Sequence, residues 1–262
     1  MITASRGVEA SAPGSFPTGW YGKIPGTGDF IARRIPASFS ESWDRWLQAA
    51  VGGSRDRLGA RWRDSFLSMP AWRFMLAPGV LTQNAWAGLM VPSVDAVGRY
   101  FPLTLAAALP SASVDLLGSL LAAASWFDQL EAIALKAIAP GADTGAIDAA
   151  LAERPFKSEW LKLPRATDAT VPIRGAKAQM LWVPLAQQTS NQRLPATLRE
   201  LADRLAEPYS AWLAEESEVF GRCVLLCETL PPGEQYCAMM DGRWTEHGWG
   251  RRDLEAPGAG SA

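Results

Sequence analysis

Two apolar runs, each with a proline at its inner end, constrain the fold more than any other feature of this sequence. The runs are residues 86–91 and 103–109, and Pro92 and Pro102 stand between them. Proline has no backbone N–H and does not fit the middle of a hydrogen-bonded ladder, so we expect a strand boundary at each proline. The pattern predicts two buried strands joined by a structured loop.

The loop between these runs is short and polar. It contains Ser93, Asp95, Gly98 and Arg99. Asp95 and Arg99 are close enough in sequence to pair, and glycine tolerates the positive φ that a tight corner requires. The residues alone favour a charge-paired turn over an active site, and both interpretations stay open at this point.

The composition is that of a globular protein, with 48% hydrophobic and 20% charged residues among 262. Twelve tryptophans indicate a large buried or interfacial aromatic area. A net charge of −2 gives no overall attraction for nucleic acid. Three cysteines, an odd number, argue against a disulfide framework and fit a reducing compartment.

The sequence predicts a cytoplasmic protein without membrane insertion. Residues 1–17 lack the apolar stretch of a signal peptide, and charged residues interrupt the apolar window 103–138. We expect residues 1–18 to be a disordered segment and 251–262 a flexible tail. Residues 19–250 are expected to form one domain with lobes 19–140 and 141–250.

The hydrophobic patterns predict helices and strands in mixed order. Helices are predicted from Ser38 to Gly52-Gly53, where the two glycines end the apolar stripe, and over 55–69, 115–138, 144–154 and 194–214. Strands are predicted over 19–25, 71–77, 86–91, 103–109, 178–184, 222–227 and 235–240, the last two as a hairpin. Because regular strand–helix–strand alternation is absent, we expect an α+β fold, a central mostly antiparallel sheet with helices packed on its faces.

Few residues carry the signature of a catalytic or metal site. His247 is the single histidine and is expected on the surface, while Cys223, Cys227 and Cys237 lack zinc-site spacing and read as buried structural thiols. A carboxylate metal site built from Asp29, Asp44 and Asp95 is conceivable, although their spacing does not require it. The glycine-rich loop at residues 22–28 fails the phosphate-loop pattern.

A basic stretch lies in the second predicted helix. It contains Arg55, Arg57, Arg61 and Arg63, offset in part by Asp56 and Asp64. A solvated helix face is the favoured interpretation, and a partner-binding patch is the alternative.

Two motifs together resemble a known family. The first is GKIPGTGDF at residues 22–30, followed by Phe39, Trp43-Asp44 and Trp46-Leu47, and the second is PSVDAVGRYFPL at residues 92–103. In this order and spacing they resemble the signature of the TagF family, also called ImpM, which is associated with type VI secretion. The strong resemblance covers about residues 19–110.

The resemblance implies a non-enzymatic, cytoplasmic accessory protein with no cofactor and a longin- or profilin-like fold. Members of the family act as post-translational repressors of type VI secretion, together with a forkhead-associated (Fha) scaffold protein and a threonine-phosphorylation pathway. The partner expected for this chain is therefore the Fha scaffold, with other secretion components as further candidates, and not nucleic acid.

The polar residues of the two motifs are the candidate site. They form either a partner-binding cluster or an internal ion-pair network if the two loops meet: Lys23, Asp29, Asp44, Ser93, Asp95 and Arg99. The alternative of another class is a phosphate-binding or metal-dependent hydrolase that uses Asp29, Asp95 and Arg99, with Mg²⁺ as a conceivable metal.

Overall fold

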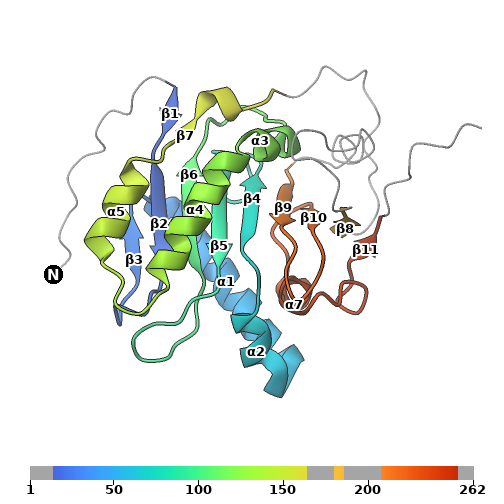
Figure 1. The fold of residues 1–262 in the computed structure, drawn as a ribbon. Helices are drawn as coiled ribbons and strands as arrows, with labels where there is room; N and C mark the ends of the chain where they lie inside the picture. The colour runs from blue at the N-terminus through green and yellow to red at the C-terminus, as the bar shows by residue number, and fades with distance from the viewer. Residues whose placement is uncertain (1–13, 164–179, 186–207, 253–262) are drawn as a thin grey trace, which may run out of the picture.

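A large, mostly antiparallel sheet forms the centre of the molecule. The computed structural model describes residues 14–163, 180–185 and 208–252. Within them the sheet has the order β11-β8-β10-β9-β4-β5-β6-β2-β3, and only the β11–β8 pair is parallel (Figure 1). Its strands are β2 (Thr18–Gly22), β3 (Ile31–Arg33), β4 (Trp72–Leu76), β5 (Trp86–Val91), β6 (Leu103–Ala108), β8 (Met180–Pro184), β9 (Ser210–Ala214), β10 (Cys223–Cys227) and β11 (Gly250–Arg251).

Helices cover both faces of this sheet. One face carries α3 (Leu116–Ala122), α4 (Ala124–Ala137) and α5 (Thr144–Ala152), and the other carries α1 (Ala37–Leu58), α2 (Trp62–Leu67) and α7 (Gly233–Asp241). In Figure 1, α4 and α5 lie in front of the strands and α1 lies behind them. Strand residues alternate between the two cores: Leu89 faces the first helical layer and Met90 the second. This arrangement confirms the predicted α+β class.

Aromatic side chains fill the core under α1. Trp43 lies between α1 and the sheet, stacked on Phe39 at 5.3 Å and against Phe74 at 5.0 Å between ring centroids. Its indole Nε1 donates a hydrogen bond of 2.9 Å to Thr104 Oγ1 on β6. The high tryptophan content therefore serves mainly the packing of this helical layer onto the sheet.

Most of the predicted elements are confirmed. Strands β4, β5, β6, β8 and β10 lie where the sequence predicts them, and α5 matches the predicted helix at 144–154. The long helix predicted over 115–138 is present as α3 and α4, separated at Ala123, and Asp115 caps it by accepting a 2.8 Å hydrogen bond from the Gly118 N–H.

The prediction that Gly52-Gly53 ends the first helix is wrong. Helix α1 continues to Leu58, and the predicted helix 55–69 is instead the end of α1, the 3-10 turn Gly59–Arg61 and α2. The helix begins at Ala37, one residue before the predicted start, and Pro36 stands at the N-cap without a side-chain hydrogen bond. Gly53 faces α7: a Cβ built on it would lie 3.5 Å from Gly233 Cα. The glycine therefore permits close approach of two helices instead of ending one.

The predicted strand at 235–240 is wrong as well. These residues form α7, so the predicted hairpin with β10 is absent, and β10 pairs with β8 and β9. The run is short and buried on most sides, and such runs do not show whether they are strand or helix. Pro232 stands at the N-cap and Gly242 at the C-cap in the left-handed conformation, which are favoured helix boundaries.

The predicted helix at 194–214 is wrong in its last part. Ser210–Ala214 form β9, a fully buried strand between β10 and β4, while residues 194–207 lie outside the described residues. The sequence also gave no signal for β3, a three-residue strand at the sheet edge.

The structure shows where the described secondary structure begins near the N-terminus and how the two predicted lobes are connected. Residues 1–13 and 253–262 lie outside the described residues, but Ser15–Phe16 already form β1, which pairs with β7 (Phe156–Lys157). Ordered structure therefore begins before residue 19. Strands of both predicted lobes share the large sheet, since β4 pairs with β9.

In the part of the chain that the structure describes, no helix combines the length and apolarity needed to cross a membrane.

The contact between α1 and α7 predicts the effect of a substitution at Gly233. A Cβ there would lie 3.3 Å from the Ala49 carbonyl oxygen and 3.6 Å from Gly53 Cα, both backbone atoms that do not give way easily. Gly233→Val is expected to lower the free energy of unfolding by about 1–3 kcal/mol, measured by urea denaturation.

Gly52→Ala is the matched control. A Cβ at Gly52 would meet no atom within 4 Å, so alanine in the helix is expected to raise stability by about 0.5–1 kcal/mol. Equal stability of the two variants would contradict the close helix contact.

Candidate functional site

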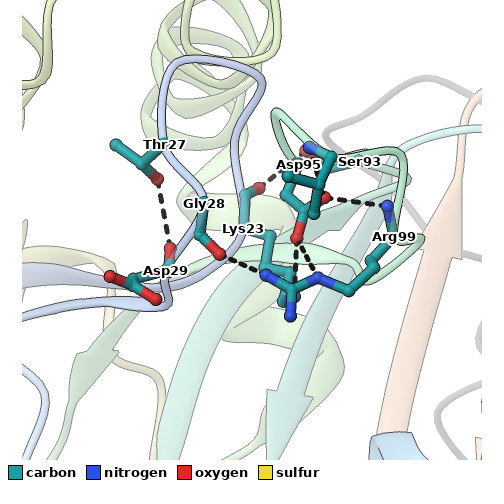
Figure 2. A network of polar contacts seen from close by, with 8 residues as sticks. Lys23, Thr27, Gly28, Asp29, Ser93, Asp95 and Arg99 are labelled. Atoms are coloured by element: carbon teal, nitrogen blue, oxygen red, sulfur yellow. Dashed lines mark hydrogen bonds and ion pairs between the residues drawn. The ribbon is translucent and has the colours of Figure 1, made fainter.

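The two motif loops lie side by side because of the strand order. One loop follows β2 (residues 23–30) and the other follows β5 (residues 92–102). Both strands pair antiparallel with β6, which lies between them, so β2 and β5 run in the same direction. Their C-terminal ends therefore reach the same edge of the sheet, and the polar residues of the two loops meet there (Figure 2).

The Asp95 carboxylate is the centre of this cluster. Its Oδ2 accepts from Lys23 Nζ and from Arg99 Nε, both at 2.7 Å. Its Oδ1 accepts from the backbone N–H groups of Val97 at 3.0 Å and Arg99 at 2.8 Å. The Asp95 side chain has no solvent exposure. A carboxylate offers about four acceptor positions, so these donors occupy all of them.

The surroundings keep Asp95 ionised. Burial by itself raises the pKa of a carboxylic acid, but the hydrogen bonds from Lys23, the Arg99 backbone and side chain and the Val97 N–H outweigh it. The net pKa of Asp95 lies well below its usual range. A general base needs a pKa near the operating pH and a free acceptor position, and Asp95 has neither.

Further hydrogen bonds tie the two loops together. Ser93 Oγ donates to the Lys23 carbonyl oxygen at 2.7 Å, and the Arg99 guanidinium donates to the Gly28 carbonyl oxygen. The Ala96 N–H donates to the Thr27 carbonyl oxygen at 3.2 Å. The network therefore joins Lys23, Ser93, Asp95 and Arg99, which the sequence placed in two separate motifs.

Gly98 and the neighbouring aromatic rings complete the corner. Gly98 has a φ of 83°, as the sequence predicted for this position. Phe30 packs edge-on against Phe101 at 4.8 Å between centroids, and Lys23 Nζ lies 4.8 Å from the Phe30 ring centre. Tyr100 extends the contact to α2, where it meets the Trp62 ring at 5.3 Å.

Asp29 and Asp44, the other two predicted site residues, do not join the network. Asp44 accepts from Tyr21 Oη at 3.0 Å and from Gln48 Nε2 at 2.6 Å. Burial and the Asp44 hydrogen bond raise the pKa of Tyr21 above its ordinary value. The Asp29 carboxylate points away from Asp95 in Figure 2, and the Asp29 backbone carbonyl accepts a 3.1 Å hydrogen bond from Thr27 Oγ1. The convergence that a metal site or a hydrolase would need from these carboxylates is not present.

The histidine, cysteine and carboxylate side chains elsewhere in the described residues do not form a metal site either. Within the described ranges, no group of three or more histidine, cysteine, aspartate or glutamate residues is arranged to hold a metal ion. The three cysteines are buried and free, as predicted, and burial raises the pKa of Cys227 and Cys237 to about 11. Thiols of this kind are unreactive near neutral pH.

The expected surface position of His247 is wrong. The ring is buried, with 6% of the residue exposed, and its Nε2 lies 3.1 Å from Asp241 Oδ2. The tryptophans near it in sequence, Trp244 and Trp249, are themselves buried. These two aromatic residues near His247 were the available sequence signal for its burial, and the prediction did not use it.

Sequence reasoning also missed a buried arginine. Arg73 on β4 is 5% exposed, and its guanidinium pairs with Asp128 at 2.8 Å, Glu131 at 3.1 Å and Glu215 at 3.5 Å. Its position inside an apolar strand was the available signal. The cluster joins α4 to β4 and the end of β9. Because its carboxylates are already paired with Arg73, we interpret it as a structural ion-pair network.

The network predicts a ranking of stability losses. Lys23→Met leaves Asp95 with a buried charge that lacks one partner, so the free energy of unfolding is expected to fall by about 3–5 kcal/mol. Arg99 is 59% exposed, and Arg99→Ala is expected to cost only about 1 kcal/mol. Urea denaturation measures both, and a smaller loss for Lys23→Met than for Arg99→Ala would contradict the buried network.

The lowered pKa of Asp95 predicts a loss of stability in acid. Its contribution is complete above the pKa of the unfolded chain, about 3.9, and is lost as the pH falls toward the lower folded-state pKa. The stability difference between the natural protein and Asp95→Asn is therefore expected to be constant from about pH 5 to about pH 8 and to shrink below about pH 4. Urea denaturation at several pH values measures it. A difference that grows in acid would mean that the Asp95 pKa is raised.

Comparison with known proteins agrees with the two motifs. The model of the TagF N-terminal domain, type VI secretion system-associated, matches residues 19–154. The crystal structure of PA0076 from Pseudomonas aeruginosa PAO1 is similar in fold, with a TM-score of 0.69 and 33% sequence identity over 92% of this chain and 99% of that chain. No curated protein matches. The family match covers more than half of the chain and contains both loops of the Asp95 network, and the chain belongs to the type VI secretion-associated TagF family.

Proposed function

We propose that this protein is a non-enzymatic, cytoplasmic repressor of type VI secretion that acts by binding a forkhead-associated scaffold protein. Holding the scaffold would keep the secretion apparatus from assembling. Membership of the TagF family supports the type VI secretion role. The repressor mechanism and the scaffold as partner are the proposal.

The observation that carries the proposal is how the motif residues divide between interior and surface. Lys23, Ser93 and Asp95 are buried and satisfy one another. With every acceptor position of Asp95 occupied, these residues fix the shape of two loops and have little capacity left for chemistry. The arrangement favours a rigid binding edge over an active centre.

The exposed residues on the same two loops are of the kind that binding surfaces use. Phe30 is 46% exposed and Val97 is 68% exposed, and Arg99 presents part of its guanidinium to solvent between the two loops. Aromatic residues and arginine are enriched among residues that dominate protein–protein binding energy. A loop held by a buried ion pair also loses little conformational entropy when a partner binds.

Binding of the purified forkhead-associated scaffold by isothermal titration calorimetry tests this proposal. Val97→Asp is expected to weaken binding at least about tenfold because it places an unpaired charge in the interface, with an unchanged melting temperature because Val97 packs little. Leu135→Asp on α4 is the matched control, since Leu135 is 56% exposed and lies outside the loops.

Two results would contradict the proposal. A natural protein that does not bind the scaffold would remove the proposed partner, and equal losses for Val97→Asp and Leu135→Asp would remove the proposed edge. In cells, excess natural protein is expected to suppress secretion, and excess Val97→Asp is expected not to do so.

A further inference from the structure

The junction of α1 and α2 carries a set of exposed arginines that form no ion pair with a described carboxylate. Arg55, Arg57, Arg61 and Arg63 are all exposed, and none forms an ion pair with a described residue. We refer to these four residues as the arginine surface. Figure 1 shows that α2 and the end of α1 project below the sheet, away from α4 and α5. Asp56 and Asp64 in the same segment offset this positive charge only in part, although the net charge of the chain is −2.

One residue of the arginine surface, Arg55, is held by packing against a buried ring. The Arg55 guanidinium lies 4.2 Å from the centre of the Trp62 ring, within the range of a cation–π contact. Trp62 is buried, and its Nε1 donates to Ser54 Oγ at 2.8 Å. Arg55 is therefore oriented before any partner arrives, which lowers the entropy cost of binding.

The second motif loop contacts the helix that carries part of the arginine surface. Trp62 contacts Tyr100 at 5.3 Å between ring centroids, and Tyr100 follows Arg99 in the chain. The Tyr100 ring also meets Phe66 at 5.7 Å, so the loop after β5 packs along α2. The loop that carries Arg99 is therefore in contact with α2, the helix that carries Arg63.

We propose that the arginine surface binds an acidic protein segment. This inference rests on the proposed function, because it describes the chemistry by which the scaffold or another secretion component is held. Guanidinium groups form paired hydrogen bonds with carboxylates, and unpaired ones at a surface attract an anionic partner.

Charge and apolar exposure favour a protein segment over nucleic acid or a lipid surface. Asp56 and Asp64 stand among the arginines and are exposed. A continuous row of phosphates would meet these carboxylates at a cost, whereas a protein segment can place neutral or basic groups opposite them. Leu67, 46% exposed at the end of α2, offers an apolar contact for an amphipathic segment.

The test compares two pairs of charge reversals that change the net charge equally. Arg57→Glu/Arg61→Glu alters the arginine surface without touching the Arg55–Trp62 contact. Arg33→Glu/Lys136→Glu is the control, because both residues are exposed on β3 and α4, away from that surface. Circular dichroism and thermal melting check that both variants fold, and Arg57→Gln/Arg61→Gln repeats the test without reversed charge.

Two probes are used with each protein, and binding of duplex DNA and of anionic lipid vesicles is measured for comparison. One is the purified forkhead-associated scaffold, measured by isothermal titration calorimetry. The other is a fluorescent helical peptide of about 20 residues with leucine on one face and glutamate on the other, measured by anisotropy. For both probes we expect the arginine-surface variant to bind at least about tenfold more weakly than the natural protein and the control to bind within about twofold. Raising the salt from about 0.05 to about 0.3 M is expected to weaken binding of the natural protein.

Each outcome separates this inference from the proposed function. If the scaffold binds the natural protein and the arginine-surface variant equally, the inference is wrong and the proposed function stands. If the scaffold binds neither, the proposed partner is wrong, and equal peptide binding by natural protein and variant would also overturn the inference. If duplex DNA or anionic lipid vesicles bind the arginine surface more tightly than the peptide does, the class of partner is wrong.

Discussion

The buried negative charge of Asp95 is the constraint on which the motif loops depend. A carboxylate without solvent contact is tolerated only if charged and hydrogen-bonding groups surround it. Lys23 and Arg99 supply the opposite charge, and backbone N–H groups of its own loop supply the remaining donors. Both loops must therefore keep one conformation, and the common direction of β2 and β5 brings them close enough to do so.

The same edge of the sheet combines an interior suited to rigidity with a surface suited to recognition. Lys23 and Asp95 are withdrawn from solvent, whereas Phe30, Val97 and Arg99 are presented on loops that those residues hold. Because Tyr100 packs on Trp62 and Phe66, the loop after β5 is in direct contact with α2. The repressor role proposed above would need an exposed binding surface more than a cleft.

Much of the candidate site could be predicted from the sequence. The turn chemistry of residues 92–102 is local, so the Asp95–Arg99 pair and the positive φ of Gly98 could be read from spacing alone. The separation of Asp29 and Asp44 from that pair could not, because it depends on which way each side chain points after the strands align. The His247–Asp241 contact needs the fold of the turn after α7 in the same way.

The sequence by itself determined the α+β class, the strands that flank Pro92 and Pro102 and the turn between them, since proline geometry, hydrophobic period and turn chemistry act over a few residues. The tertiary structure decided the identity of short buried runs: residues 235–240 became a helix and Ser210–Ala214 a strand. Runs buried on all sides show no polar face, so their neighbours choose between the two forms. The tertiary structure also decided the role of Gly53, which allows α1 and α7 to approach closely. In the sequence, a glycine that ends a helix cannot be distinguished from one that makes room for a second helix.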